Sequence, residues 1–233
     1  MTVPDAARFE VLTFDCYGTL IDWETGLLAA LAPVFARHGV GLSGERTLEV
    51  FGALEFEIER EPYQPYRDIL GRVLTRMGES LAFTPSRAEA ARFADSVGDW
   101  PPFADSTAAL HTLGARHKLA IISNVDDELF ARSARRLETT FDWIVTAQSV
   151  RAYKPSPLVF RAAFDRIAVP PARILHVAQS LYHDVAPARA LGLATVWVNR
   201  RGRPGFGATP PSDARPDFEV PDLESLVRVL GAA

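Results

Sequence analysis

Hydrophobic and polar positions follow two different patterns along this chain, and the change falls near residue 100. A short run of apolar, β-forming residues at 11–14 predicts a buried strand, which gives way to a polar stretch with a glycine at 15–19. Apolar positions then recur with helical spacing, separated by Gly or Pro, at 26–38, 45–60, 66–77 and 86–97. We therefore expect one strand followed by a long helical stretch.

From residue 101 onward, short apolar strands alternate with amphipathic helices. The pattern predicts strands at 119–122, 143–146, 174–178 and 195–199, and helices at 106–116, 128–137, 157–167 and 184–191. Such alternation is typical of a parallel sheet with helices on both faces. We predict an α/β fold with a Rossmann-like parallel-sheet core of residues 1–20 and 101–233. A helical cap of residues 21–100 is inserted after the first strand.

Polar residues stand where the predicted strands end, at the edge where open α/β sheets bind ligands. Asp15 closes the first strand, Ser123 and Asn124 follow the second, and Asp184 opens the helix expected after 174–178. Each of them could be an ordinary turn or helix-cap residue. A carboxylate whose position is fixed by hydrogen-bond donors is also a competent covalent nucleophile, so Asp15 is the candidate nucleophile.

Two further residues could support this nucleophile. Thr19 offers a hydroxyl and a backbone N–H close to Asp15 in the sequence. Lys154, just before a predicted helix, is either a solvated surface lysine or the cation that keeps the carboxylate ionised. Ser123 and Asn124 could cradle an anion beside it.

Composition and charge exclude several classes of protein. A net charge of -4 over 233 residues gives no electrostatic footprint for nucleic acid, and no apolar stretch is long enough for a membrane span. Residues 1–10 lack the apolar core of a signal peptide. Cys16, the only cysteine, allows no internal disulfide and no cysteine zinc site. We expect a cytoplasmic protein without nucleic-acid or membrane partners, and a homodimer stays open.

Four motifs in order resemble those of the haloacid dehalogenase-like superfamily. They are Asp-x-Tyr-Gly-Thr-Leu at 15–20, Ile-Ile-Ser-Asn at 121–124, Tyr-Lys-Pro at 153–155 and the late acid Asp184. The first and third look most like the type II (L-2-haloacid) dehalogenase branch. The resemblance implies that Asp15 attacks a substrate atom and forms an ester that water later hydrolyses. Thr19, Ser123 and Lys154 would hold Asp15 and the substrate, and Asp184 would order Lys154 and the water.

Two departures distinguish the chain from the phosphatases of this superfamily. In those phosphatases the first motif contains a second aspartate that protonates the leaving group, and Tyr17 stands in its place here. Gln179 stands where the phosphatases have the first of two acids that bind Mg²⁺. Halide leaves carbon without a proton, so it needs neither residue. We therefore predict cleavage of the carbon–halogen bond of a small, anionic 2-haloacid without metal or other cofactor. The alternatives are a Mg²⁺-dependent small-molecule phosphatase and a non-catalytic binding protein.

The substrate-facing residues depart from the dehalogenase branch as well. The cap arginine that the resemblance implies is Val50 here, and Arg46 lies one helical turn earlier on the same face, with Arg60 and Arg67 as further candidates. The remaining residues expected at the substrate are Tyr17, Asn124, Gln179, Tyr182 and His183. His183 could bond a backbone group or act as a base toward the hydrolytic water. Cys16, a rival nucleophile, should point away from the side that Asp15 serves.

Overall fold

The computed structural model describes residues 6–202 and 211–231. Within these residues six parallel strands form one sheet in the order β3-β2-β1-β4-β5-β6. The strands are β1 (Val11–Phe14), β2 (Lys118–Ser123), β3 (Trp143–Thr146), β4 (Ile174–Ala178), β5 (Ala194–Val198) and β6 (Phe218–Val220). Phe14 pairs with Ile121 on one side and with Val177 on the other, so β1 lies at the centre of the sheet.

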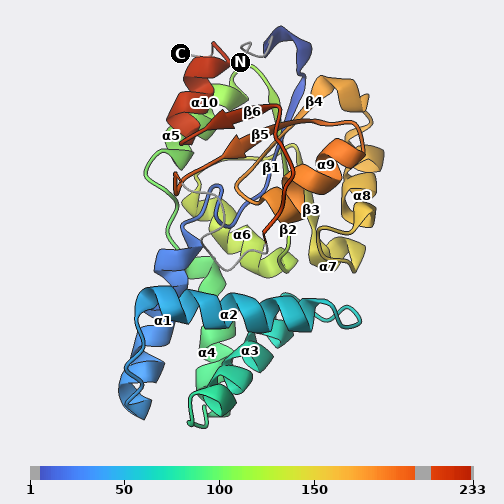
Figure 1. The fold of residues 1–233 in the computed structure, drawn as a ribbon. Helices are drawn as coiled ribbons and strands as arrows, with labels where there is room; N and C mark the ends of the chain where they lie inside the picture. Colours follow the sequence, from blue (N-terminus) through green and yellow to red (C-terminus); the bar gives the residue numbers. More distant parts are fainter. Residues whose placement is uncertain (1–5, 203–210, 232–233) are drawn as a thin grey trace.

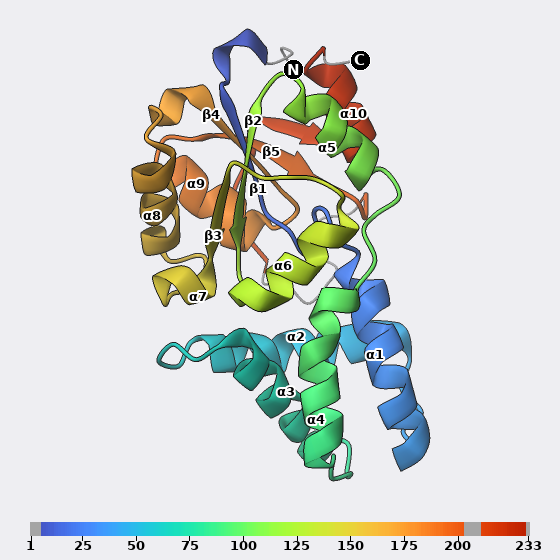
Figure 2. The same ribbon diagram turned by 180° about the vertical axis from the view of Figure 1, so that it is seen from behind.

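Helices cover both faces of the sheet (Figures 1 and 2). One face packs against α8 (Pro157–Ile167) and α9 (Ala186–Ala190), and the other against α5 (Ser106–Gly114), α6 (Asp127–Arg136) and α10 (Leu223–Val229). Successive residues of β1 point to opposite faces: Val11 joins the hydrophobic cluster of α8, whereas Leu12 joins the cluster of α5. Both faces of the central strands are therefore apolar, as a fully covered parallel sheet requires.

Four further helices come between β1 and α5 in the sequence, and we call them the cap helices. They are α1 (Trp23–His38), α2 (Gly44–Glu59), α3 (Tyr66–Ser80) and α4 (Arg87–Asp95). They lie together beyond the carboxyl ends of the strands, in the lower half of Figure 1. Ser86 and Glu89 form a capping box at the start of α4, and Ser43 caps α2. The division into a core of 1–20 and 101–233 and a cap of 21–100 stays a prediction.

The junction between the cap helices and the sheet is tightly packed at Gly26 of α1. A Cβ built on Gly26 would stand only 2.2 Å from the Trp100 side chain. The absence of a side chain at this position lets the indole lie directly against the helix backbone. Trp100 in turn meets Tyr17 edge to face, with ring centroids 5.8 Å apart.

The predicted α/β parallel-sheet fold is confirmed, with differences at the shorter elements. Three short elements were not predicted from the sequence: β6, α10 and α7 (Ala147–Val150), which have three to seven residues each. The helix expected at 184–191 is present as α9, but Asp184 does not open it, because Asp184 lies inside a π-helical turn (Leu181–Val185) that precedes α9. Three 3₁₀ turns complete the described residues: Ala6–Arg8, Ser96–Asp99 and Pro171–Arg173. None of the helices in the described ranges is both long and apolar enough to cross a membrane.

Candidate active site

Asp15 follows the last residue of β1 and lies at the carboxyl edge of the sheet. Its side chain is buried, with the residue only 7% exposed. Thr19 donates a hydrogen bond from Oγ1 to Asp15 Oδ2 over 2.8 Å, and the same hydroxyl accepts the Gln179 backbone N–H over 2.9 Å. The loop between them turns sharply at Gly18, whose φ of 94° favours glycine. These bonds fix the orientation of the Asp15 carboxylate.

Lys154 holds the second oxygen of that carboxylate. Its Nζ donates to Asp15 Oδ1 over 2.8 Å, to Asp184 Oδ1 over 2.6 Å and to the Ile122 carbonyl over 2.9 Å. An ammonium has three protons to donate, so all of them are used. Lys154 is only 2% exposed, and a buried cation between two carboxylates is costly to disturb. The predicted association of Asp15, Lys154 and Asp184 is therefore present in the structure.

The three charged groups shift one another's ionisation. Burial raises the pKa of Asp15, although Lys154 acts in the opposite direction. Burial also tends to raise the pKa of Asp184, but Lys154 and His176 outweigh it and the pKa is lowered. Burial alone would lower the pKa of Lys154, yet the two carboxylates keep it above its usual value. Lys154 is consequently a permanent cation in this cluster.

Two neighbours hold Asp184 and Lys154 in place. His176 Nε2 lies 3.0 Å from Asp184 Oδ1, and its Nδ1 lies 2.9 Å from Thr13 Oγ1, so the ring is fixed at both nitrogens. Asn124 donates from Nδ2 to the Lys154 carbonyl and accepts the Lys154 backbone N–H at Oδ1, over 3.1 and 2.7 Å. Both ends of the Asn124 amide face the Lys154 backbone. Asn124 therefore positions the lysine with its carbonyl oxygen and one N–H, and its role toward a bound anion stays a prediction.

A cavity of about 100 Å³ opens in front of Asp15. Ser123 is one of the lining residues, and its hydroxyl oxygen is buried and has no hydrogen-bond partner among the described residues. Buried hydroxyls are nearly always bonded, so this oxygen is available to a bound molecule. The remaining lining residues are Asp15, Tyr17, Trp23, Glu55, Glu59, Tyr66, Trp100, Asn124, Lys154, Gln179, Ser180, His183 and Asp184.

The cap helices contribute an acidic wall that the sequence analysis missed. Glu55 and Glu59 of α2 both line the cavity, and Tyr66 of α3 donates its hydroxyl to Glu55 Oε1 over 2.6 Å. Burial raises the pKa of Glu55 to about 7 and that of Glu59 well above its usual value. The available signal was the spacing of the two acids, which puts both on one face of the helix predicted at 45–60.

Arg46 does not reach this cavity. Its guanidinium is 62% exposed and pairs with Glu49 over 2.7 Å, and it borders a separate surface pocket together with Val50. The expectation that Arg46 and Val50 share a helical face is thus correct, but that face is turned away from Asp15. Nine residues separate Arg46 from Glu55, which is two and a half helical turns and hence the opposite side of α2. The prediction that Arg46 replaces the cap arginine is not supported.

The other arginine candidates also have partners elsewhere. Arg67 pairs with Asp95 and Glu128, both over 2.8 Å. Arg60 stacks over the Phe56 ring, 5.5 Å from its centroid. Neither arginine is among the residues that line the cavity.

The remaining predicted substrate contacts differ in their access to the cavity. Gln179 lines it and accepts the Trp197 indole N–H at its carbonyl over 2.8 Å. His183 lines it too, 3.3 Å from Ser180 Oγ, and burial lowers its pKa to about 4. Tyr182 is not a lining residue, because its ring packs edge to face against Phe56 of α2. Tyr182 joins the cap helices to the sheet edge instead.

Tyr17 and Cys16 follow Asp15 in the loop. Tyr17 lines the cavity, but its hydroxyl is bonded to Ser133 Oγ over 2.9 Å, and burial raises its pKa well above the usual value. Cys16 is fully buried in the hydrophobic core, where desolvation raises the pKa of its thiol. A thiol of this kind is inert, which removes the rival nucleophile.

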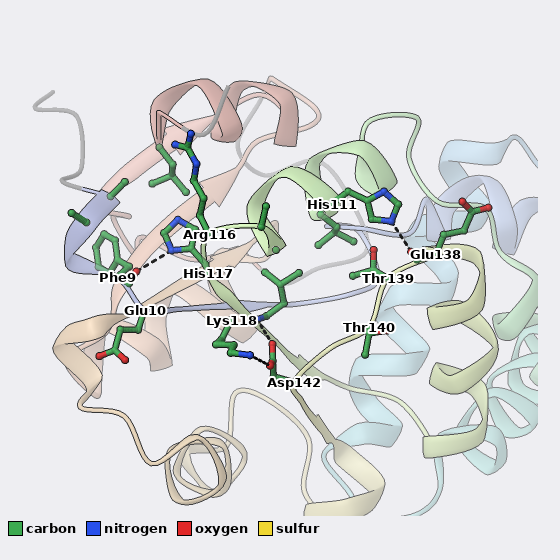
Figure 3. A pocket seen from close by; sticks show the side chains of 17 residues that line it. Phe9, Glu10, His111, Arg116, His117, Lys118, Glu138, Thr139, Thr140 and Asp142 are labelled. Carbon is green, nitrogen blue, oxygen red and sulfur yellow. Dashed lines mark hydrogen bonds and ion pairs between the residues drawn. The ribbon is translucent and has the colours of Figure 1, made fainter.

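A larger groove of about 1070 Å³ lies at the opposite edge of the sheet, where β1 and β2 begin (Figure 3). Two of its polar side chains are already paired: His117 with the Phe9 carbonyl over 2.9 Å, and Lys118 with Asp142 over 2.8 Å. It contains neither the carboxylate–lysine cluster nor an unpartnered buried hydroxyl. The smaller cavity is therefore the candidate active site.

The fold family also includes Mg²⁺-dependent enzymes, and the side chains present here do not fit that ion. Mg²⁺ needs carboxylate oxygens free to face it, whereas Asp15 and Asp184 both direct an oxygen at Lys154 Nζ. The lysine ammonium occupies the position between the two acids. The described residues also contain no cluster of three or more acidic, His or Cys side chains arranged to hold a metal.

A buried carboxylate fixed by a lysine and a threonine, at the carboxyl edge of a parallel sheet roofed by helices, is an arrangement suited to an enzyme with an aspartate nucleophile. A family model described as haloacid dehalogenase-like hydrolase matches residues 9–192. The chain belongs to this family, as its motifs predict, and is an enzyme of the haloacid dehalogenase-like hydrolase type.

Individual relatives agree with this assignment. Haloacetate dehalogenase H-2 of Moraxella sp. (strain B) is 27% identical over 229 residues, which cover 96% of this chain and 98% of that protein. (S)-2-haloacid dehalogenase 4A of Burkholderia cepacia is 27% identical over 225 residues, with 93% and 90% covered. The structure of L-2-haloacid dehalogenase from Xanthobacter autotrophicus with chloropropionic acid covalently bound has a TM-score of 0.82 at 22% identity. It covers 96% of this chain and 98% of its own. The last similarity extends to the fold alone.

Proposed function

We propose that this enzyme hydrolyses the carbon–halogen bond of a small 2-haloacid through a covalent ester on Asp15. The observation that carries the proposal is the placement of Asp15, whose carboxylate faces the cavity while Lys154 and Thr19 fix both of its oxygens. The names of the relatives, which are dehalogenases of haloacetate and of 2-haloacids, support the same reaction.

The first step forms the ester. An oxygen of the Asp15 carboxylate attacks carbon 2 of the substrate, a C–O bond forms, and the carbon–halogen bond breaks with its electron pair leaving on the halide. Holding the carboxylate rigid in a site of low polarity favours this attack, because little reorganisation is needed. Lys154 keeps the carboxylate ionised, since a protonated acid would be a poor nucleophile.

The second step hydrolyses the ester. Water adds to the carboxyl carbon of Asp15, the bond from that carbon to the substrate oxygen breaks, and the 2-hydroxyacid leaves with an oxygen that came from Asp15. The water gives up both of its protons. We assign acceptance of the first to the neutral imidazole of His183, which lines the cavity and passes the proton to the departing product oxygen, and the second is released as Asp15 returns to its carboxylate form. The products are a hydroxyacid, a halide ion and a proton.

The leaving group is the reason for choosing a halide over a phosphate ester. A halide needs no proton on departure, whereas an alkoxide does. The loop residue best placed to supply a proton, Tyr17, has its hydroxyl bonded to Ser133 and a strongly raised pKa. On the substrate side, the unpartnered Ser123 hydroxyl is the donor that we assign to the substrate carboxylate.

A single-turnover reaction in H₂¹⁸O tests the ester. With enzyme in excess over 2-chloropropionate, we expect ¹⁸O in the Asp15 carboxylate and unlabelled hydroxyacid, because the product oxygen comes from Asp15. Label in the product from the first turnover, with none in Asp15, would mean direct attack by water. Asp15→Asn is the matched variant, and it should form neither product nor label.

A further inference from the structure

The side of the active-site cavity formed by the cap helices, which we call the cap wall, carries acidic residues. A substrate with only a carboxylate would be expected to bind a cation there instead. Glu55 and Glu59 stand one turn apart on α2, and both line the cavity that Asp15 faces. Tyr66 donates to Glu55 over 2.6 Å. Within the described residues the Glu59 carboxyl group accepts no hydrogen bond that affects its pKa, and Glu55 and Lys154 are the charged groups that act on it. This wall therefore presents two carboxyl groups to whatever the cavity holds.

No free cation on the lining compensates for these acids. Lys154 has committed its three protons to Asp15, Asp184 and the Ile122 carbonyl, so it has none left for a ligand. His183 is neutral at physiological pH, and no arginine is among the described lining residues. A negative group placed against the cap wall would meet two carboxyl groups without a counterion, whereas a bound ammonium would lower their raised pKa values and favour their ionised form.

The opposite side of the cavity has the reverse character. Ser123 lines the cavity beside Asp15, and its Oγ is buried and has no hydrogen-bond partner among the described residues, so it can donate to a bound anion. Aromatic rings accompany the acids on the cap side, from Trp23, Tyr66 and Trp100. Carboxylates together with aromatic rings form a suitable environment for an ammonium group.

We propose that the substrate is a 2-haloacid that also carries an ammonium group, which binds Glu55 and Glu59 while its carboxylate end lies at Ser123. The inference rests on the proposed function and adds the substrate class. Glu55 and Glu59 are then the residues that determine specificity, and the molecule is a short zwitterion, since about 100 Å³ holds only a few heavy atoms.

Two matched substrates test this inference by turnover. For the wild-type enzyme, kcat/KM should be at least about tenfold higher for 2-chloro-4-aminobutanoate than for 2-chlorobutanoate. The first compound has the ammonium group and the second lacks it, so the ratio reports the ion-pair contact with the two glutamates. In the double variant E55Q/E59Q the ratio should fall to near one. Glu57→Gln on the exposed side of α2, where Glu57 pairs with Arg76, should keep the wild-type ratio. Turnover of both compounds with no preference in either enzyme would overturn the inference and leave the dehalogenase function standing.

A binding measurement decides the case in which neither compound is turned over. Tryptophan fluorescence, which reports on Trp23 and Trp100 at the cavity, is titrated with n-butylammonium and separately with butyrate. We expect butylammonium to bind the wild type about tenfold more tightly than E55Q/E59Q. Equal affinity of butylammonium for both proteins, or tighter binding of butyrate by the wild type, would refute the ammonium site. A positive result without turnover would refute only the proposed reaction.

Discussion

Lys154 and Asp15 form an ion pair of 2.8 Å in which the lysine side chain is only 1% exposed. The same Nζ also lies 2.6 Å from Asp184, so one cation neutralises two buried carboxylates. Removing it leaves both acids without a counterion in a medium that solvates them poorly. We expect Lys154→Met to lower the free energy of unfolding by about 3–5 kcal/mol at neutral pH, as measured by urea denaturation.

The chain provides a matched control for this substitution. Lys118, its other lysine, pairs with Asp142 over the same 2.8 Å, but its side chain is 66% exposed. Lys118→Met should change the unfolding free energy by less than about 1 kcal/mol, because exposed ion pairs contribute little. Similar losses in the two variants would show that burial of the Lys154 cluster is not what makes it costly to disturb. Activity should disappear only in Lys154→Met.

A substitution of Tyr17 distinguishes a halide leaving group, which needs no proton, from an alkoxide, which does. Since its hydroxyl is engaged with Ser133, we expect Tyr17→Phe to change kcat/KM for 2-chloropropionate by less than about threefold. A residue that served as general acid would instead cost about 10²–10⁴ in rate. Initial rates of chloride release measure the difference. A loss of the larger size would argue that Tyr17 takes part in proton transfer and would reopen the phosphatase alternative.

Gly26 and Gly71 both lie in helices, and replacing each of them with alanine should change the stability of the protein in opposite directions. A Cβ at Gly26 would overlap the Trp100 side chain, so Gly26→Ala should destabilise the protein by about 1–3 kcal/mol and lower activity by shifting Trp100. Gly71 in α3 has open space around it, and Gly71→Ala should stabilise by about 0.4–1 kcal/mol. Thermal unfolding of both variants checks the pair. A stable, fully active Gly26→Ala would contradict the packing described.

Ionisation of Glu55 should make the free energy of unfolding depend on pH. Its pKa is raised from 4.5 to about 7 in the folded protein, so the folded state holds its proton more tightly than the unfolded state does. The stabilisation is complete below pH 4.5 and is lost as the pH rises through 7. Relative to Glu55→Gln, the wild type should lose at most about 3 kcal/mol between these limits, since one pKa unit is worth about 1.4 kcal/mol.

The measurement compares urea unfolding of the wild type and Glu55→Gln at several pH values from 4.5 to 8. Glu57→Gln, on the exposed side of the same helix, should follow the wild-type curve. Parallel curves for the wild type and Glu55→Gln would mean that Glu55 ionises normally. In that event the acidic wall would be charged throughout the range.

The sheet and the nucleophile cluster could be predicted from the sequence because each depends on local signals. Apolar strands that end in Asp15 or Ser123 identify the edge of a parallel sheet, and the sheet itself brings these ends together. The pairing of Lys154 with Asp15 follows, since a lysine in that loop has few other buried carboxylates to meet. Short elements such as β6 and α10 lacked the length that a periodic pattern needs.

The cap-side contacts could not be predicted in the same way. Helical periodicity shows that Arg46 and Val50 share a face, but it does not show which face of α2 meets the sheet. That rotation is set by packing, for example of Phe56 against Tyr182. The structure turns Glu55 and Glu59 inward. The role of Asn124 was likewise hidden, because its bonds to the Lys154 backbone join residues 30 positions apart.

The two sides of the cavity come from separate stretches of the chain, and this has a consequence for how such enzymes diverge. Asp15, Ser123 and Lys154 lie at the ends of strands or in loops of the sheet, whereas Glu55 and Glu59 belong to a helix inserted between β1 and β2. Sequence changes in that helix alter which molecules are admitted without moving the group that attacks them. Substitutions in this one helix can therefore change the substrate of such an enzyme during evolution, while the residues that break the bond stay the same.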